Sequence, residues 1–349
     1  MFDSEGAAKI KSRGLSVMKF GFLPFPDRPV LKLAKLAKLA EDCEFDFVWI
    51  PDENPSPPYR NIFVALTSIA MKTRRIKLGA NTCNPYTRHP ALLATAISSL
   101  HELSGGRAVL GLGPGGRLCL KPLGLKMWEK PLSAVRESVK VIRQLFTGKT
   151  VDFEGKVITV KNLKLVPPPK TTIPIYLAAR SPKMLELVGE IADGAILTTS
   201  LEYLDFAMKR IKEGAEKSGR DLTQIDIANA LPFAIAKNGK RAREFVRAGV
   251  GFMIDHIPPI MLEKTGIDEG DVKMVKEEIL KGKIEKAAKL VTDDMLDAFS
   301  IAGTPKECIR RLEEFMDAGV TQLIIRIPPS RSTERNIKEI RKEIITKMK

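Results

Sequence analysis

The stretch from Ile76 to Gly116 restricts the fold of this 349-residue chain more than any other part of it. It reads as an apolar run, a polar loop, a helix pattern, a Ser-Gly-Gly turn, a second apolar run and a glycine-rich loop. Two short apolar runs joined by a helix are the pattern of a parallel βαβ unit that is covered on both faces. Both expected strands, Ile76–Ala80 and Ala108–Leu112, end in polar loops, which is where α/β proteins bind ligands.

This unit recurs along the chain. Strands are expected near positions 18, 47, 76, 108, 173, 194, 226 and 321, and helices alternate with them. Eight such units predict one (β/α)8 TIM barrel over residues 18–349. The chain is longer than the roughly 250 residues typical of this fold, so insertions are expected near 117–130, 150–172 and 240–300. A hairpin is expected over 151–160. Residues 1–17 are expected to form a flexible extension.

The segment VLKLAKLAKLAEDC, residues 30–43, allows two interpretations. Its lysines at 32, 35 and 38 are typical of a cationic helix on a membrane surface. Alternatively it is a barrel helix that turns Leu33, Leu36, Ala37 and Ala40 inward. A strand over Phe47–Ile50 follows at once, and this favours the barrel helix.

Charge and composition exclude several classes of function. The net charge of +15 favours anionic partners. Nucleic acid is not expected, because only 6% of residues are aromatic and the basic residues are spread along the chain. No apolar run approaches the ~20 residues of a membrane span, so the cytoplasm is expected. The four cysteines lie far apart with no histidine at ligand spacing, so neither a metal site nor a disulfide framework is expected.

Two polar clusters follow the early strands. Asp52 and Glu53 are adjacent acids at the end of a strand, although a solvated loop would explain them equally well. The glycines of GLGPGG, residues 111–116, formally satisfy the dinucleotide fingerprint. Pro114 within the motif and the number of repeated units argue against a dinucleotide-binding fold. The loop is better interpreted as a barrel loop whose backbone N–H groups approach a phosphate or polyol.

The later strands end in groups suited to an anion. Ala179, Arg180 and Ser181 combine a small residue, a cation and a hydroxyl with a helix start. Thr198 closes the next strand in a similar way. The later βα loops of TIM barrels commonly hold phosphate, whereas the simpler interpretation of Ser181 is a helix cap.

Protein acid–base groups are sparse, since the chain has three histidines. His89 precedes a proline at a helix start, which favours capping or loop packing. His101 lies late in a helix, where interaction with the helix dipole explains it. Neither a Ser-His-Asp order nor a metal cluster is evident, so we expect a bound cofactor to carry the chemistry.

Five segments of the chain resemble the bacterial-luciferase-like superfamily. They are most similar to the coenzyme F420-dependent methylenetetrahydromethanopterin reductases of archaea, which belong to one-carbon metabolism related to methanogenesis. The segments are NPYTRHP (84–90), SGGRAVLGLGPG (104–115), IPIYLAARSP (173–182), EIADGAILTTS (190–200) and DDMLDAFSIAGTPKECIRRLEEFMDAGVTQLII (293–325).

The resemblance implies a luciferase-like TIM barrel with a flavin or deazaflavin at its C-terminal mouth. It implies a non-prolyl cis peptide at Asn81–Thr82 behind the ring, with Asp52 and Asn84 beside the ring. The coenzyme's tail and phosphate would be held by Pro114, Gly115, Ala179, Arg180, Ser181 and Thr198. The anionic, glutamylated tail of the coenzyme would also give the basic surface a use.

Three positions depart from the pattern of these reductases. Leu23 stands where they carry a glutamate, His101 where they carry an aspartate, and Glu53 where a histidine is common. Because such groups shape the substrate side, the coenzyme assignment is the firmer one. Hydride transfer can proceed by orientation alone, and Glu53, His101 or water would supply any proton.

The sequence therefore predicts an F420-dependent oxidoreductase that moves a hydride between the deazaflavin and a small-molecule acceptor such as a tetrahydropterin. The family implies a homodimer. One alternative is an FMN-dependent luciferase-like monooxygenase. The other is a non-catalytic barrel that serves as a binding protein, which the three departures would allow.

Overall fold

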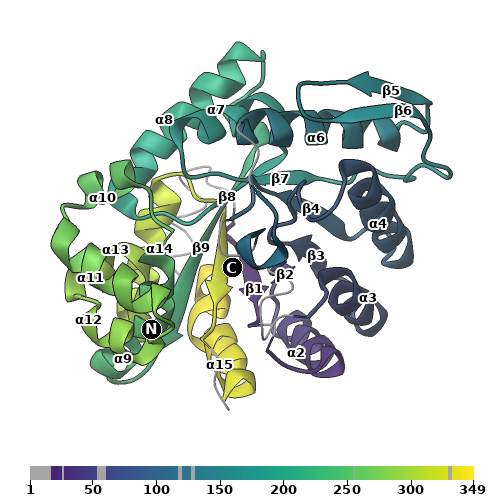
Figure 1. Ribbon diagram of the computed structural model, residues 1–349. Helices are drawn as coiled ribbons and strands as arrows, with labels where there is room; N and C mark the ends of the chain where they lie inside the picture. The colour runs from purple at the N-terminus through teal and green to yellow at the C-terminus, as the bar shows by residue number, and fades with distance from the viewer. Residues whose placement is uncertain are drawn as a thin grey trace.

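Eight parallel strands close into a barrel, and helices surround it (Figure 1). The computed structural model describes residues 17–25, 27–52, 60–116, 120–126, 130–254, 256–328 and 332–349. Around the barrel the order is β1-β2-β3-β4-β7-β8-β9-β11, and β11 pairs with β1. These strands are β1 Lys19–Leu23, β2 Phe47–Ile50, β3 Lys77–Ala80, β4 Ala108–Leu112, β7 Ile175–Ala178, β8 Gly194–Leu197, β9 Asp226–Ile235 and β11 Gln322–Arg326. The predicted TIM barrel and its eight strands are confirmed.

One main helix follows each of the first six barrel strands, and longer segments follow β9 and β11. The helices that cover the barrel are α2 Val30–Asp42, α3 Ile62–Lys72, α4 Pro90–Leu103, α6 Pro131–Phe146, α7 Pro182–Ile191, α8 Leu201–Lys217, α14 Pro305–Asp317 and α15 Thr333–Ile340. Short helical turns lie at Lys121–Leu123 and Leu222–Gln224, and the chain ends in a π-helical turn, Arg341–Ile345, followed by α16 Thr346–Met348.

Two segments interrupt the βα alternation. The antiparallel hairpin of β5 Val151–Glu154 and β6 Thr159–Leu163 follows α6, where a hairpin is predicted. The second segment is helical, as predicted, and contains α9 Gly239–Ile254, α10 Pro259–Thr265, α11 Glu269–Leu280, α12 Ile284–Leu290 and α13 Asp293–Phe299. It ends in β10, Ile301–Gly303, which pairs with the end of β9 and was not expected. The predicted N-terminal extension lies outside the described residues except for Val17, and the segment near 117–130 is described only in part.

Helix α2 belongs to the barrel and not to a membrane surface. Its apolar side chains Leu33, Leu36, Ala37 and Ala40 are buried in the core, while Lys32 and Lys35 face solvent. Within the described part of the chain, none of the helices combines the length and apolar character needed to cross a bilayer.

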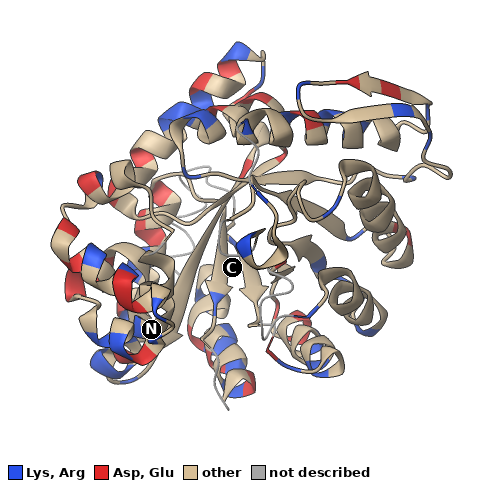
Figure 2. Cartoon of the chain, in the orientation of Figure 1, with Lys and Arg blue, Asp and Glu red and all other residues tan. Residues whose placement is uncertain are grey.

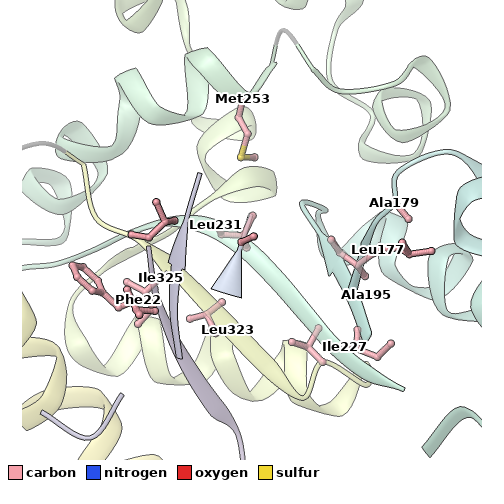
Figure 3. Packing of buried hydrophobic residues seen from close by; sticks show 14 of the residues in the cluster. Phe22, Leu177, Ala179, Ala195, Ile227, Leu231, Met253, Leu323 and Ile325 are labelled. Carbon is pink, nitrogen blue, oxygen red and sulfur yellow. The ribbon is translucent and has the colours of Figure 1, made fainter. Parts of the chain in front are cut away.

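The core has two layers. Strand side chains such as Phe22, Ile325 and Leu231 pack outward against the helices (Figure 3). Inside the barrel, Trp49 stacks on Phe47, and its indole N–H donates to Gln322 Oε1 at 2.7 Å. A Cβ on Gly79 would overlap this indole ring, so glycine is required on the neighbouring strand. These side chains fill the interior of the described barrel, as is usual for an eight-stranded barrel.

The arginine of the Ser-Gly-Gly-Arg turn has a structural role. The buried guanidinium of Arg107 donates to the carbonyl oxygens of Ala70 at 3.0 Å and Ile76 at 2.9 Å, and to Thr73 Oγ1 at 2.9 Å. It thereby satisfies acceptors at the C-terminal end of α3, which have no partner within the helix itself. This conspicuous motif lies at the N-terminal end of β4, away from the mouth.

Candidate active site

A cavity of about 360 Å³ lies at the carboxyl ends of the barrel strands. It brings together every residue that the resemblance assigns to the coenzyme. These residues are Asp52, Asn81, Thr82, Asn84, Pro114, Gly115, Ala179, Arg180, Ser181 and Thr198. They come from β2, β3, β4, β7 and β8 and are spread over about 150 positions of sequence, so the barrel closure alone explains their meeting. Their convergence is as predicted, whereas their roles remain a proposal.

The loop after β3 is tied directly to the loop after β4. Cys83 N–H donates to Gly111 O at 2.9 Å, and Gly113 N–H donates to Cys83 O at 2.9 Å. A Cβ on Gly111 would overlap the carbonyl oxygen of Ala80, and one on Gly113 would lie 2.9 Å from Thr82 Oγ1. These two glycines therefore permit close loop packing, and Gly115 and Gly116 line the cavity. The Asn81–Thr82 peptide in this wall is cis, as the resemblance implies.

Asn84 organises the turn that follows. Its Oδ1 accepts from the backbone N–H groups of Tyr86 at 3.1 Å and Thr87 at 3.0 Å. This side-chain-to-backbone pattern is an Asx turn, and it fixes where the next residue points. That residue is Arg88, whose guanidinium packs over the ring of Phe63 and forms an ion pair with Asp52. The carboxylate of Asp52 is therefore held at the rim with its charge compensated.

The walls from β7 and β8 contain the expected anion-binding features. Ser181 occupies the N-cap position of α7, yet its hydroxyl makes no capping hydrogen bond to the described backbone. The structure therefore does not support the interpretation of Ser181 as a helix cap. Ser181 and Met184 line the cavity, and the N–H groups in the first turn of a helix have no partner within the helix. Arg180 is fixed from both ends, since its carbonyl accepts from Tyr203 Oη at 2.7 Å and its Nη1 donates to His256 O at 3.2 Å.

Of the two predicted acid–base residues, one is misplaced and one lies outside the described residues. His101 is in the last turn of α4, at the opposite end of the barrel from the cavity, where its Nε2 lies 2.7 Å from Thr171 Oγ1. Helix α4 runs back along the barrel after β3, so a residue late in it reaches the amino ends of the strands. The prediction that His101 supplies a proton is therefore wrong. Glu53 lies outside the described residues.

His89 has the capping role predicted for it. Its Nδ1 accepts from the backbone N–H of Ala91 at 3.2 Å at the start of α4. Among the described residues, no group of three or more His, Cys, Asp or Glu side chains is arranged to hold a metal ion.

The comparisons with known proteins agree with this geometry. The pattern that defines the luciferase-like monooxygenase family matches residues 18–322. The chain belongs to this family. A 5,10-methylenetetrahydromethanopterin reductase of Methanolobus tindarius is 41% identical over 330 residues, which are 94% of this chain and 100% of that protein. The enzyme of the same name from Archaeoglobus fulgidus is 40% identical, with 95% and 100% covered.

The fold of this luciferase-like chain is also similar to that of solved structures. The coenzyme F420-dependent tetrahydromethanopterin reductase of Methanopyrus kandleri superposes with a TM-score of 0.89 at 35% identity, and the match covers 96% of this chain and 100% of that one. An F420-dependent secondary alcohol dehydrogenase has the same fold, with a TM-score of 0.79 at 21% identity.

Three residues of this luciferase-like site escaped the sequence analysis. Arg88 stands in the NPYTRHP segment, but its pairing with Asp52 spans 36 positions and depends on the Asn84 turn. Arg326 is the last residue of β11 and lines the cavity, so its place at a strand end was an available signal. His256 comes from the helical insertion, whose position over the mouth no local pattern indicates.

Proposed function

We propose that this protein is a coenzyme F420-dependent oxidoreductase of the 5,10-methylenetetrahydromethanopterin reductase type. It transfers a hydride between the deazaflavin and a small-molecule acceptor of the tetrahydropterin class. The observation that carries the proposal is that ten residues, which are far apart in the sequence, line one cavity at the carboxyl ends of the barrel strands. Relatives with this activity in their names are 36–41% identical over nearly the whole chain, which supports it.

The residues of the cavity fit an anionic coenzyme. The N-terminus of α7 and the Ser181 hydroxyl offer donors to a phosphate, and Arg180 adds a positive charge beside them. The wall formed by Asn81, Thr82 and Pro114 is made of small or flat groups that a ring system can approach. We therefore propose that the tail is held by the β7 and β8 loops and that the ring rests against the β3 and β4 loops.

The protein's own contribution to the reaction is positioning. When bound, the deazaflavin supplies the carbon that gives or takes the hydride. The loops after β3 and β4 are cross-linked by backbone hydrogen bonds, and the Asp52–Arg88 pair braces the adjacent β2 end, so the ring wall is rigid before ligands arrive. Rigid placement of two reactants is by itself a large part of a rate enhancement. Glu53 stays a prediction as the proton donor.

The proposal is tested by coenzyme titration followed by turnover. Purified protein is titrated with F420 and with FMN while fluorescence is recorded, and tight binding of F420 over FMN is expected. Reduced F420 is then mixed with 5,10-methylenetetrahydromethanopterin, and oxidation of the coenzyme is expected. Ser181→Ala should raise the Kd for F420 by about tenfold, because one charge-assisted hydrogen-bond donor is lost. Ser218→Ala, at an exposed serine after α8, is the matched control.

Each outcome of these assays separates the candidates. Binding of FMN with oxygen consumption would favour the monooxygenase. Binding of F420 without turnover of any acceptor in a panel would favour a binding protein. Binding of neither coenzyme would refute the proposal.

We also propose that the protein is a homodimer. Val64 and Met71 are 57% and 63% exposed and lie seven residues apart, so they share one face of α3. Leu92 on the neighbouring α4 is 64% exposed. A second copy of the chain would remove this apolar surface from water. Light scattering should give twice the mass of the chain, and a monomer at micromolar concentration would contradict this.

We place the reaction in the cytoplasm. Cys43, Cys83 and Cys308 are free, buried thiols, which suits a reducing compartment. Recovery of the native protein in the cytoplasmic fraction of cells would support this, and recovery in a secreted fraction would contradict it.

A further inference from the structure

Arg326 directs its side chain into the barrel mouth. Side chains alternate along a strand, so Gln322, Ile324 and Arg326 of β11 share one face. Gln322 bonds the indole of Trp49, and Ile324 packs in the interior cluster, so this face is the inner one. Arg326 is therefore an inward-facing cation at the carboxyl end of its strand, and it lines the cavity.

The surroundings of Arg326 are apolar. Leu23 of β1 is its partner in the strand register, belongs to the interior cluster and lines the same cavity. Ile196 and Ala230, from β8 and β9, complete the apolar floor. A half-buried guanidinium in such a setting loses hydration without a compensating charge.

The other charged side chains of the described cavity wall are engaged. Asp52 is paired with Arg88, and Arg180 donates to the carbonyl of His256. By contrast, the described residues provide Arg326 with no ion pair and no side-chain hydrogen bond. Its donors are therefore free to bind a ligand.

The position of Arg326 assigns it to one side of the cavity. The residues proposed for the coenzyme come from the consecutive strands β2, β3, β4, β7 and β8. The remaining arc of the barrel, β9, β11 and β1, contributes Ala230, Arg326 and Leu23. A ligand that fills this arc would lie next to the proposed coenzyme site. The arc therefore suits the acceptor, which must lie beside the coenzyme to exchange a hydride with it.

We propose that Arg326 is a specificity-determining residue that binds a carbonyl or carboxylate oxygen of the acceptor. A guanidinium donates two parallel N–H groups to such planar oxygen groups. The apolar Leu23 leaves the cation unpaired and so keeps it available. The inference rests on the coenzyme half of the proposed function and deepens it by naming the chemistry that the second substrate must present.

The first test separates the acceptor from the coenzyme. Arg326→Leu should lower kcat/KM for 5,10-methylenetetrahydromethanopterin by roughly 10- to 100-fold, the range for a hydrogen bond to a charged group, and mainly through KM. The Kd for F420 should stay within about twofold, since the proposed function places the coenzyme on the β2, β3, β4, β7 and β8 side of the cavity. Arg326→Lys should recover part of the loss. Arg310→Leu removes an arginine that is 76% exposed on α14 and is the matched control.

The second test uses the neighbouring position. Leu23→Met keeps the register neighbour of Arg326 apolar and of similar volume, so kcat/KM for the acceptor should stay within about twofold of wild type. A loss as large as that of Arg326→Leu would show that disturbed packing, and not the missing cation, lowers activity, and would overturn the proposal.

A third measurement does not depend on turnover. Oxamate, a small molecule with one carboxylate and one carbonyl group, is titrated calorimetrically into the wild-type protein with and without F420. Binding that weakens at least about tenfold in Arg326→Leu supports the proposal. Equal binding to both proteins, or no binding to either, overturns it. If F420 fails to bind while oxamate binding depends on Arg326, the proposed function fails and the anion site stands.

Discussion

At the scale of single residues, Asp52 shows how a buried carboxylate is paired with a cation at the rim of the barrel. Its side chain is 2% exposed, and Arg88 is its ion-pair partner. The same carboxylate faces the thiol of Cys83, whose pKa is raised well above its usual value by burial and by the charge of Asp52. The site thus contains a neutral thiol, a compensated acid and one free cation, Arg326.

The Asp52–Arg88 pair gives a residue-scale prediction. Arg88→Gln leaves a buried carboxylate without its cation, so it should destabilise the fold by about 3 kcal/mol. It should also weaken F420 binding, because the β2 end is no longer braced. Urea unfolding and fluorescence titration measure the two effects. Arg341→Gln breaks an exposed pair with Glu44 and should cost less than about 1 kcal/mol. Equal losses in the two variants would contradict this account.

The sequence could predict where residues converge but not how they pair. The carboxyl ends of parallel strands meet at one rim, so Asp52, Thr82 and Ser181 could be brought together from strand order alone. The contact of Arg88 with Asp52 depends on a turn geometry that no periodicity encodes. The error at His101 was avoidable, because a residue late in a βα helix must lie at the opposite rim.

At the scale of elements, the predicted and observed strands agree closely because the pattern of apolar residues in them is regular. Strands β2 and β4 have the predicted bounds, Phe47–Ile50 and Ala108–Leu112. Strand β10 was missed because it has three residues and pairs only with the end of β9. A pattern that short carries no period from which to infer a strand.

One buried acid joins two elements and makes the stability depend on pH. Glu41 of α2 accepts backbone N–H groups of Arg74 at 2.8 Å, Arg75 at 2.6 Å and Ile76 at 3.0 Å, just before β3. Burial acts to raise the pKa of this carboxyl, but these hydrogen bonds prevail and lower the pKa from 4.5 to about 2.

A depressed pKa means that folding favours the ionised form. The contribution of Glu41 is therefore complete above pH 4.5 and is lost as the pH falls towards 2. Glu41→Gln should lower the free energy of unfolding by roughly 1–3 kcal/mol at pH 7. The difference from wild type should shrink over that acid range. Urea melts at several pH values measure it, and a difference that does not vary with pH would refute the assignment.

At the scale of the whole molecule, the charge is distributed rather than focused. Figure 2 shows Lys and Arg spread over the outer helices, while the barrel strands carry few charges. The net charge of +15 means that the molecule as a whole attracts anions at long range. A field of this kind accelerates encounter and adds little to the strength of the final complex.

The association rate of F420 should therefore fall with salt. Raising the ionic strength from about 0.02 M to about 0.5 M shortens the Debye length from roughly 20 Å to roughly 4 Å, so attraction of the anionic tail is screened. Stopped-flow fluorescence should show association slowed by about tenfold and dissociation changed little, because screening acts before contact. The coenzyme stripped of its phosphate and glutamyl tail is the control, and its association should be nearly independent of salt. Equal salt dependence of both ligands would mean that the basic surface serves another partner.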